Sequence, residues 1–268
     1  MRHVRGVAVG LACYFLILEL ACRLGVYVEH TRYSTAKGLV HTTFGWHKDG
    51  LDHETLSRLA TAAHHAGRVN IVSPAAANEL ARKFDDENNG FLNTYNQVPR
   101  AVTQTDLARL LAVYFEGGLY IDVDVVVRGS VIAAANGTWF VEKIVSVNKL
   151  SEREALVPRR IANYAFAAPA RCPLLRLMLE EAMRRCKQLE GKRWTDADVT
   201  WVGPDVVTTI VTMYPEGTQV LSKIASTATI MHLGKGVWKS QAEIKNGHIW
   251  VGALASFLGV VAAYLMIK

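Results

Sequence analysis

Two aspartates, Asp122 and Asp124, stand two positions apart where a short apolar segment ends. Side chains at positions i and i+2 of an extended segment point the same way, so this spacing predicts two carboxylates on one face. Two close carboxylates repel each other unless a cation neutralises them. Hard oxygen ligands suit Mg²⁺ or Mn²⁺, so the pair predicts a divalent cation that bridges to a phosphate.

The sequence before this pair predicts the elements that must position it. Thr105 is expected to cap a helix that ends at the pair Gly117 and Gly118. A strand over 119–121 follows and delivers the aspartates at its carboxyl end, where ligands sit in open α/β sheets. One face of the helix is predicted to be core because apolar residues recur at helical spacing: Leu107, Leu110, Leu111, Tyr114 and Phe115.

Apolar runs alternate with helical patterns along the middle of the chain, which predicts a single Rossmann-like α/β domain over residues 39–240. Further strands are expected over 39–44, 69–72, 161–166 and 229–233. Further helices are expected over 56–66, 74–84, 173–187 and 205–214, the first of these ending near His64 and His65 at the surface.

Both ends of the chain are strongly apolar. Residues 249–267 carry no charge and have about the length that a membrane-spanning helix needs, with Trp250 and Tyr264 near the two ends. Residues 1–30 begin with Arg2 and Arg5 before an apolar run, which predicts an uncleaved signal anchor. A cleaved signal peptide and a buried core segment are the alternatives at the N-terminus, and a buried core helix is the alternative at the C-terminus.

The formal net charge of the 268 residues is +6, and Lys and Arg are spread along the chain. This pattern favours phosphate substrates or a membrane surface over nucleic acid as the partner. The sequon at Asn136 is consistent with a lumenal domain, in the Golgi or the endoplasmic reticulum.

The central stretch TDLARLLAVYFEGGLYIDVDV resembles the glycosyltransferases with a DxD motif. More narrowly it is similar to the family 32 enzymes, which include the yeast initiating α-1,6-mannosyltransferase and the catalytic subunits of inositol-phosphoceramide mannosyltransferase. Supporting segments are NYAFAAPARCPLL, WVGPDVVT, HLGKGVWKS and, weakly, LVHTTFGW. In HLGKGVWKS, Val237 stands where the family has Ser. The resemblance implies a GT-A fold.

The resemblance also implies roles for individual residues. Asp124 would coordinate Mn²⁺ or Mg²⁺ on the nucleotide diphosphate. Asp122 would bind the sugar or ribose side and contact the metal. His232 would complete the metal or phosphate site. The donor-binding residues that it implies are Asp106, Arg109, Tyr120, Asn163 and Trp238.

The activity implied is a membrane-anchored, metal-dependent transfer of a hexose to a lipid or glycan acceptor. Mannose from GDP-mannose is the expected donor, with UDP-hexoses as alternatives. Plainer readings stand beside these roles: Asp106 and Arg109 as a surface ion pair, Asn163 as a turn residue, and His232 as a structural histidine. A second Asp-x-Asp, at Asp196 and Asp198, is predicted to be a helix-start pair.

Two other functions compete with this one. The string YIDVDVV also fits a haloacid-dehalogenase-type phosphatase, in which Asp122 would be the nucleophile. That motif normally opens its domain and needs a downstream lysine and acidic pair, which Lys192, Asp196 and Asp198 match poorly. The other alternative is a catalytically degenerate glycosyltransferase fold that acts as a membrane scaffold or binds glycans.

Overall fold

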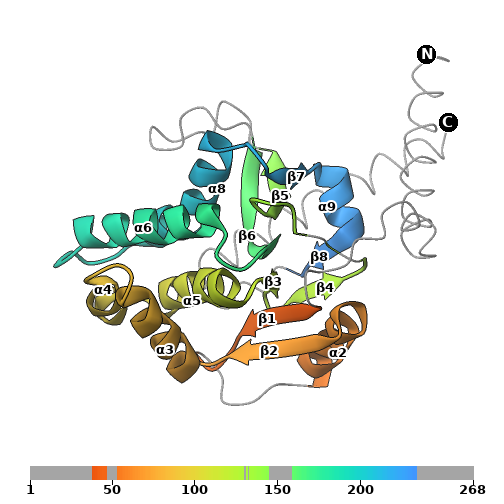
Figure 1. Cartoon of the computed structure of the whole chain (residues 1–268), viewed down its shortest axis with the longest axis horizontal. Helices are drawn as coiled ribbons and strands as arrows, with labels where there is room; N and C mark the ends of the chain where they lie inside the picture. The colour runs from red at the N-terminus through yellow and green to blue at the C-terminus, as the bar shows by residue number, and fades with distance from the viewer. Residues whose placement is uncertain (1–37, 47–52, 130, 132, 145–158, 234–268) are drawn as a thin grey trace, which may run out of the picture. The chain divides into compact units, whose positions relative to one another are not determined.

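The computed structural model describes residues 38–46, 53–129, 131, 133–144 and 159–233. Its centre is a six-stranded mixed sheet in the order β2-β1-β3-β6-β5-β7 (Figure 1). Strands β2, β1 and β3 run parallel, whereas β6 is antiparallel to both β3 and β5. The bounds of the six strands are Leu39–Thr43 (β1), Arg68–Val72 (β2), Gly118–Ile121 (β3), Thr138–Ile144 (β5), Arg159–Ala168 (β6) and Gln219–Leu221 (β7).

Helices cover one face of this sheet, and a helix with a small second sheet covers the other. The larger apolar core packs the side chains of Tyr120, Trp139 and Phe166 against α3 (Pro74–Asp85), α4 (Phe91–Gln97), α5 (Ala101–Glu116), α6 (Pro173–Gln188), α7 (Asp196–Val202) and α8 (Pro204–Met213). The smaller core packs Leu119, Ile121 and Phe140 against α2 (His53–Ala66), β4 (Val125–Val127) and β8 (Ile230–His232). The predicted α/β class is therefore confirmed, with a mixed sheet and the short helix α9 (Lys223–Thr229) before β8.

Local sequence explains where α3 and α5 begin. The Ser73 hydroxyl accepts a hydrogen bond from the Ala76 amide and Pro74 takes the first helical position, as the sequence predicts. The prediction that Thr105 caps α5 is wrong. The helix begins one turn earlier, at Ala101, and the Thr105 hydroxyl donates to the Val102 carbonyl inside the helix.

The pair Gly117–Gly118 ends α5 and starts β3, as predicted. Both glycines have positive φ, at 67° and 113°. A Cβ on Gly117 would lie 2.6 Å from the Ala170 amide nitrogen, and one on Gly118 would lie 2.5 Å from the Leu39 carbonyl oxygen. Only glycine lets the chain turn this sharply between two neighbouring backbones, and the turn aims β3 into the sheet beside β1.

The second sheet joins segments that lie far apart in the sequence. Strand β4 follows the two aspartates directly and pairs antiparallel with β8, so that Val125 lies opposite His232. The Leu233 amide extends the ladder by donating to the Asp124 carbonyl at 2.9 Å. The predicted strand over 229–233 therefore exists, and its position beside the aspartates is a long-range feature of the fold.

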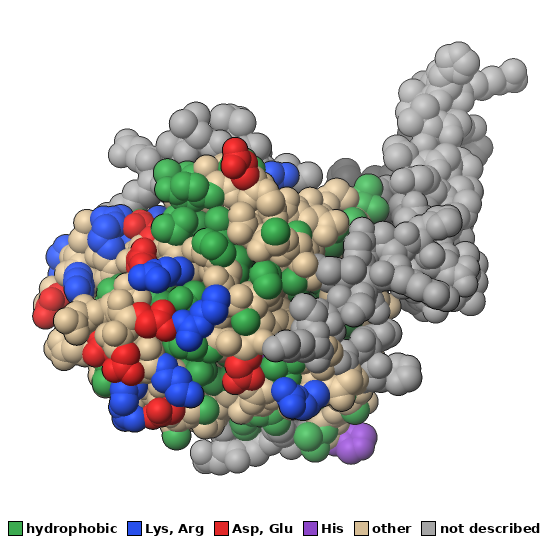
Figure 2. Space-filling view, in the orientation of Figure 1, with side chains coloured by type: hydrophobic (Ala, Val, Ile, Leu, Met, Phe, Trp, Pro, Cys, Tyr) green, Lys and Arg blue, Asp and Glu red, His purple; other side chains and the backbone are tan. Residues whose placement is uncertain are grey.

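Charges of both signs are interspersed on the face shown in Figure 2, over the helices α3, α4 and α6. Along α6, Arg176 pairs with Glu180 and Arg184 pairs with Glu181. Such pairs stabilise little. This face has no continuous patch of one sign.

No helix within the described residues is both long enough and apolar enough to cross a membrane. The two predicted membrane segments, 1–30 and 249–267, lie outside the described residues, as does Trp238.

Candidate active site

The two aspartates lie in a turn and not along an extended strand. Strand β3 ends at Ile121, and the Val125 amide donates to the Asp122 carbonyl at 3.0 Å. The i, i+2 argument for a shared face is therefore wrong, because the chain turns between the two residues. The side chains are nevertheless both partly exposed, 26% for Asp122 and 14% for Asp124. Each is held by a different set of neighbours.

Asp122 is held through one carboxylate oxygen. The Tyr120 hydroxyl donates to its Oδ1 at 2.5 Å, and Arg109 Nη2 lies 3.4 Å from the same oxygen. The Asp122 amide also donates to the Tyr164 carbonyl on β6 at 2.8 Å, which fixes the backbone. Tyr120 therefore lies within the site as predicted, and its contact is with the aspartate.

Arg109 belongs to a buried network that the sequence partly predicts. Its Nη2 is 3.0 Å from Asp106 Oδ1, and its Nη1 donates to the Asn163 carbonyl at 2.8 Å. The Asn163 amide in turn donates to Asp106 Oδ1 at 3.0 Å. The reading of Asp106 and Arg109 as a surface ion pair is wrong, because both side chains are almost wholly buried. A buried charge pair of this kind requires its hydrogen bonds to be satisfied.

Burial dominates the pKa values in this network. It raises the pKa of Asp106 to about 6, although the charge of Arg109 acts in the opposite direction. It also raises the pKa of Asp122, against the Arg109 charge and the Tyr120 hydrogen bond. Burial alone would lower the pKa of Arg109, but the nearby Asp122, Tyr120 and Asp106 raise it overall, so the guanidinium stays charged. The network thus surrounds one permanent cation with two carboxyls.

Asp124 has a partner from the other end of the described domain. His232 Nε2 lies 3.3 Å from Asp124 Oδ1, and the His232 ring stacks on Tyr164 with centroids 3.9 Å apart. Burial lowers the pKa of His232, but the hydrogen bond and charge of Asp124, with Asp122 and Glu142, raise it overall. The sequence prediction that His232 lies at the site agrees with this position.

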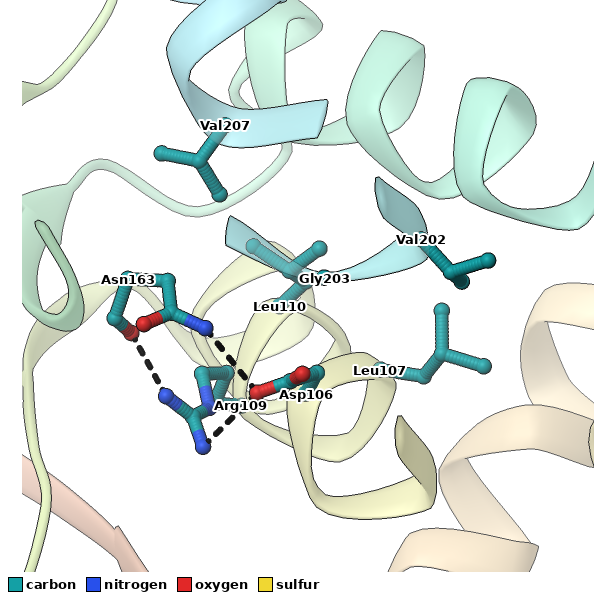
Figure 3. Close-up of a pocket in the computed structure, with 8 residues that line it drawn as sticks. All are labelled: Asp106, Leu107, Arg109, Leu110, Asn163, Val202, Gly203 and Val207. Carbon is teal, nitrogen blue, oxygen red and sulfur yellow. Dashed lines mark hydrogen bonds and ion pairs between the residues drawn. The ribbon is translucent and has the colours of Figure 1, made fainter. Parts of the chain in front are cut away.

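A small pocket lies on the α7–α8 side of the Arg109 network (Figure 3). Asp106, Arg109 and Asn163 line one side of it, and their polar groups bond to one another there. The remaining lining residues carry no polar side chain: Leu107, Leu110, Val202, Gly203 and Val207. Neither aspartate of the turn lines the pocket, so it is separate from the exposed carboxylates.

Gly203 fits closely against the Asp106 carboxyl in this pocket. A Cβ placed on Gly203 would lie 2.1 Å from Asp106 Oδ2 and 2.9 Å from its Cγ. The Gly-Pro turn between α7 and α8 therefore needs glycine for steric reasons, and its φ of −93° is ordinary. The sequence marks this turn but does not reveal its contact with Asp106.

The donor set of the two aspartates fits a divalent cation that arrives with a phosphate ligand. No group of three His, Cys, Asp or Glu side chains that could hold a metal ion occurs within the described part of the chain. Mg²⁺ is commonly held by one or two carboxylates together with substrate phosphates and water, and needs no all-protein cage. Asp122 and Asp124 supply two partly exposed carboxylates of this kind, with His232 beside the second.

The second Asp-x-Asp pair, Asp196 and Asp198, lies at the start of a helix, as predicted. Asp198 forms a capping box with Thr195 at the start of α7, and Asp196 pairs with Arg100 at 2.8 Å. These contacts occupy the acidic residues that the phosphatase alternative would need beside Asp122.

Sequence reasoning missed Arg58 and Tyr164. Arg58 stands four residues after Glu54 on α2, a spacing typical of an exposed helix pair. In the structure its side chain is buried, and Nε donates to the Val123 carbonyl, between the two aspartates, at 2.9 Å. Tyr164 lies in the predicted strand over 161–166, where alternation predicts only that every second residue faces the core. No local pattern reveals either contact.

Part of the chain matches a known protein family. Residues 49–147 match the family described as a glycosyltransferase sugar-binding region containing a DXD motif, and the matched segment includes Asp106, Arg109, Asp122 and Asp124. This part of the chain is thus similar to the sugar-binding region of DXD glycosyltransferases. A search of curated protein sequences finds no significant match.

Several solved glycosyltransferase structures are distantly similar. The structure titled "PaToxG Glycosyltransferase" is 17% identical, with a TM-score of 0.46, over 75% of this chain and 76% of that one. The UDP-bound glycosyltransferase domain from the YGT toxin is 11% identical, with a TM-score of 0.36, over 66% of this chain and 56% of that one. Identities and TM-scores this low carry no conclusion about activity.

Proposed function

We propose that this protein is a metal-dependent glycosyltransferase that takes a hexose from a nucleotide-diphosphate sugar. The observation that carries the proposal is the turn of Asp122 and Asp124 at the carboxyl end of β3, within the segment that matches the DXD sugar-binding region. Two partly exposed carboxylates at a strand end suit a phosphate ligand with its cation.

The chemistry requires the site to stabilise charge on a leaving group. As the bond from the anomeric carbon to the diphosphate breaks, negative charge collects on the diphosphate, and groups fixed in advance stabilise it best. A bound Mn²⁺ or Mg²⁺ would supply a Lewis acid at that point. Asp124 and Asp122 would hold the cation and the donor. His232, whose Nε2 lies 3.3 Å from Asp124 Oδ1, would complete the metal or phosphate site.

The narrower features of the activity are part of the same proposal. Mannose from GDP-mannose is the proposed donor, because the TDLARLLAVYFEGGLYIDVDV segment resembles the family 32 mannosyltransferases. UDP-hexoses are the next candidates. A lipid or glycan on the lumenal side of the Golgi or endoplasmic reticulum is the proposed acceptor, which follows from the predicted membrane segments 1–30 and 249–267.

The experiment that tests this function is turnover across a panel of nucleotide sugars: GDP-mannose, UDP-glucose, UDP-galactose and UDP-N-acetylglucosamine. Each is assayed with Mn²⁺ and with EDTA, for the wild type and for Asp124→Asn. We expect release of one nucleotide that depends on Mn²⁺ and falls at least about 100-fold in Asp124→Asn. Turnover with no donor, together with no thermal shift on adding Mn²⁺ and nucleotide, would favour the scaffold alternative. Phosphoaspartate trapping on Asp122 would favour the phosphatase.

A further inference from the structure

Tyr164 contacts both halves of the Asp122–Asp124 turn from strand β6. Its backbone carbonyl accepts a hydrogen bond from the Asp122 amide at 2.8 Å, and its ring stacks on His232, which pairs with Asp124. We propose that Tyr164 is a positioning residue, whose ring holds the His232 imidazole beside Asp124 for a metal-bound diphosphate. This inference rests on the proposed function and adds a residue to its site.

The side chain of His232 is weakly held by its own strand. His232 ends β8, a strand of three residues that forms a two-stranded sheet with β4, and its side chain is 30% exposed. Its Nε2 lies 3.3 Å from Asp124 Oδ1, which is longer than most hydrogen bonds between nitrogen and oxygen. A histidine side chain turns about two torsion angles, so one long contact does not fix the plane of its ring.

The Tyr164 ring, in contrast, is a fixed surface for stacking. Strand β6 lies between β3 and β5 in the large sheet, and Tyr164 is 9% exposed within the smaller core. Its ring lies nearly parallel to the His232 imidazole, with centroids 3.9 Å apart and 17° between the planes. Stacked rings attract each other beyond the effect of burial, so this contact restricts the imidazole to one plane while Nε2 faces Asp124.

A positioning role and a packing role predict different results for substitutions. A ring that only fills the core affects the protein in the same way whatever residue stands at position 232. A ring that acts through the imidazole affects ligand binding only while His232 is present. Combining changes at the two positions therefore separates the roles, because residues that act through each other give non-additive effects.

The binding test measures the affinity for UDP and GDP with Mn²⁺ in Tyr164→Leu, Tyr164→Phe, His232→Gln and the double variant of Tyr164→Leu with His232→Gln. Leucine removes the flat ring, and we expect binding of the nucleotide to weaken about 5-fold. Tyr164→Phe keeps the ring and should bind within about 2-fold of the wild type. Every variant keeps the backbone carbonyl that accepts from the Asp122 amide, so the side chain alone is tested.

The double variant decides whether Tyr164 acts through His232. It should bind the nucleotide as His232→Gln does, with no further loss. Additive losses in the double variant would overturn the positioning role, as would equal affinities in the wild type and Tyr164→Leu.

Phe140→Leu is the matched control. It makes the same change of an aromatic ring to leucine in the same smaller core, on the neighbouring strand β5, where Phe140 is fully buried. It should lose at least as much stability as Tyr164→Leu, with unchanged nucleotide affinity. An equal loss of affinity in the two variants would mean that loosening of the core explains both, and the inference would fail.

A second measurement needs neither a ligand nor a substitution at Tyr164. A proton above the face of an aromatic ring resonates upfield of its usual position, so the ring protons of His232 should be shifted upfield in the NMR spectrum of the wild type. Their signals are identified by their loss in His232→Gln, and His53, on the exposed start of α2, gives the reference. The shift should persist in Tyr164→Phe and vanish in Tyr164→Leu. Unshifted signals in the wild type would overturn the stacking, even if the leucine variant does not fold.

The two measurements distinguish failure of the proposed function from failure of the positioning role. A wild type that binds neither UDP nor GDP with Mn²⁺ overturns the proposed function, and the role of Tyr164 in binding with it. A wild type that binds one of them, with unshifted His232 signals or with unchanged affinity in Tyr164→Leu, overturns the positioning role alone.

Discussion

The two aspartates of the turn are held in contrasting ways. Asp122 contacts Tyr120 and Arg109, which lie within 13 positions of it in the sequence, in a buried network that is part of the core. Asp124 pairs with His232, which arrives from β8 more than a hundred positions later and is about one-third exposed. The Asp122 half of the site thus lies against the larger apolar core, and the Asp124 half depends on two strands of three residues each in the smaller core.

This contrast separates stability from binding. Substitutions around Asp122 should reduce both the free energy of unfolding and the ligand affinity, since Asp106 and Arg109 are buried and charged. Changes at His232 should reduce ligand affinity with little loss of stability, since its side chain is 30% exposed and it ends a strand of three residues. Four substitutions test this separation.

The largest effect is expected from Arg109→Met. Removing the guanidinium leaves Asp106 and Asp122 without their shared cation, and breaking a buried pair in this way costs roughly 3–5 kcal/mol. The measurement is the free energy of unfolding in urea. Arg82→Met, which removes the exposed pair with Glu79, is the control and should cost less than about 1 kcal/mol. Equal costs for the two variants would contradict the buried network.

Gly203→Ala should have the next largest effect, through Asp106. The added methyl group would lie 2.1 Å from Asp106 Oδ2, and Asp106 cannot move without losing its bonds to Arg109 and Asn163. Overpacking of this kind costs about 1–3 kcal/mol. The comparison is the same change made in an Asp106→Ala background, which removes the carboxyl that the added methyl group would meet. Equal losses in the urea midpoint in the two backgrounds would show that the close contact does not matter.

His232→Gln tests the other half of the site. It removes the pair with Asp124 and the stacking on Tyr164. We expect the affinity for UDP or GDP with Mn²⁺ to fall about 10-fold, while the free energy of unfolding changes by less than about 1 kcal/mol. His53→Gln, on the exposed start of α2, should change neither quantity. A large loss of stability in His232→Gln would remove the contrast between the two halves.

The smallest effect concerns His41, which supports the Asp122 side from β1. Its Nε2 contacts the Gly117 carbonyl at 2.9 Å, at the start of the turn into β3. Burial lowers its pKa, despite the opposing effects of that contact and of Glu116. The unfolded chain therefore takes up the proton first, so the stabilisation is present above about pH 6.5 and is lost as the pH falls below it.

The measurement for His41 is the free energy of unfolding at pH 7 and pH 5. The wild type should lose more stability than His41→Gln over that interval, because glutamine does not titrate. Identical pH dependence in the two proteins would show that His41 is not buried as the neutral form.

Local and long-range features also differ in how well the sequence predicts them. The glycine turn, the cap at Ser73 and the strand before Asp122 follow from rules that act over a few residues, and all three are confirmed. The sequence also predicts that four residues of the site lie close together, because one helix, one turn and one strand connect them: Asp106, Arg109, Tyr120 and Asp122.

The remaining parts of the site depend on contacts that no local pattern encodes. The burial of Arg58 results from α2 packing beside the turn, and a Glu–Arg pair at i, i+4 looks the same on a solvated helix. The register of β4 on β8 places His232 beside Asp124, and the two strands of three residues each carry little sequence signal. The close fit of Gly203 on Asp106 likewise exists only once α7 has packed on α5 and α8 has packed on β6.

The most direct test of the central claim is calorimetric binding of UDP and GDP with Mn²⁺ and with EDTA, to the wild type, Asp122→Asn and Asp124→Asn. The account predicts that one of the two nucleotides binds only with Mn²⁺, and that each substitution weakens this binding at least about 10-fold while the fold persists. Nucleotide binding that is equally tight in EDTA, or that survives both substitutions unchanged, would contradict the claim that this turn holds a metal-bound diphosphate.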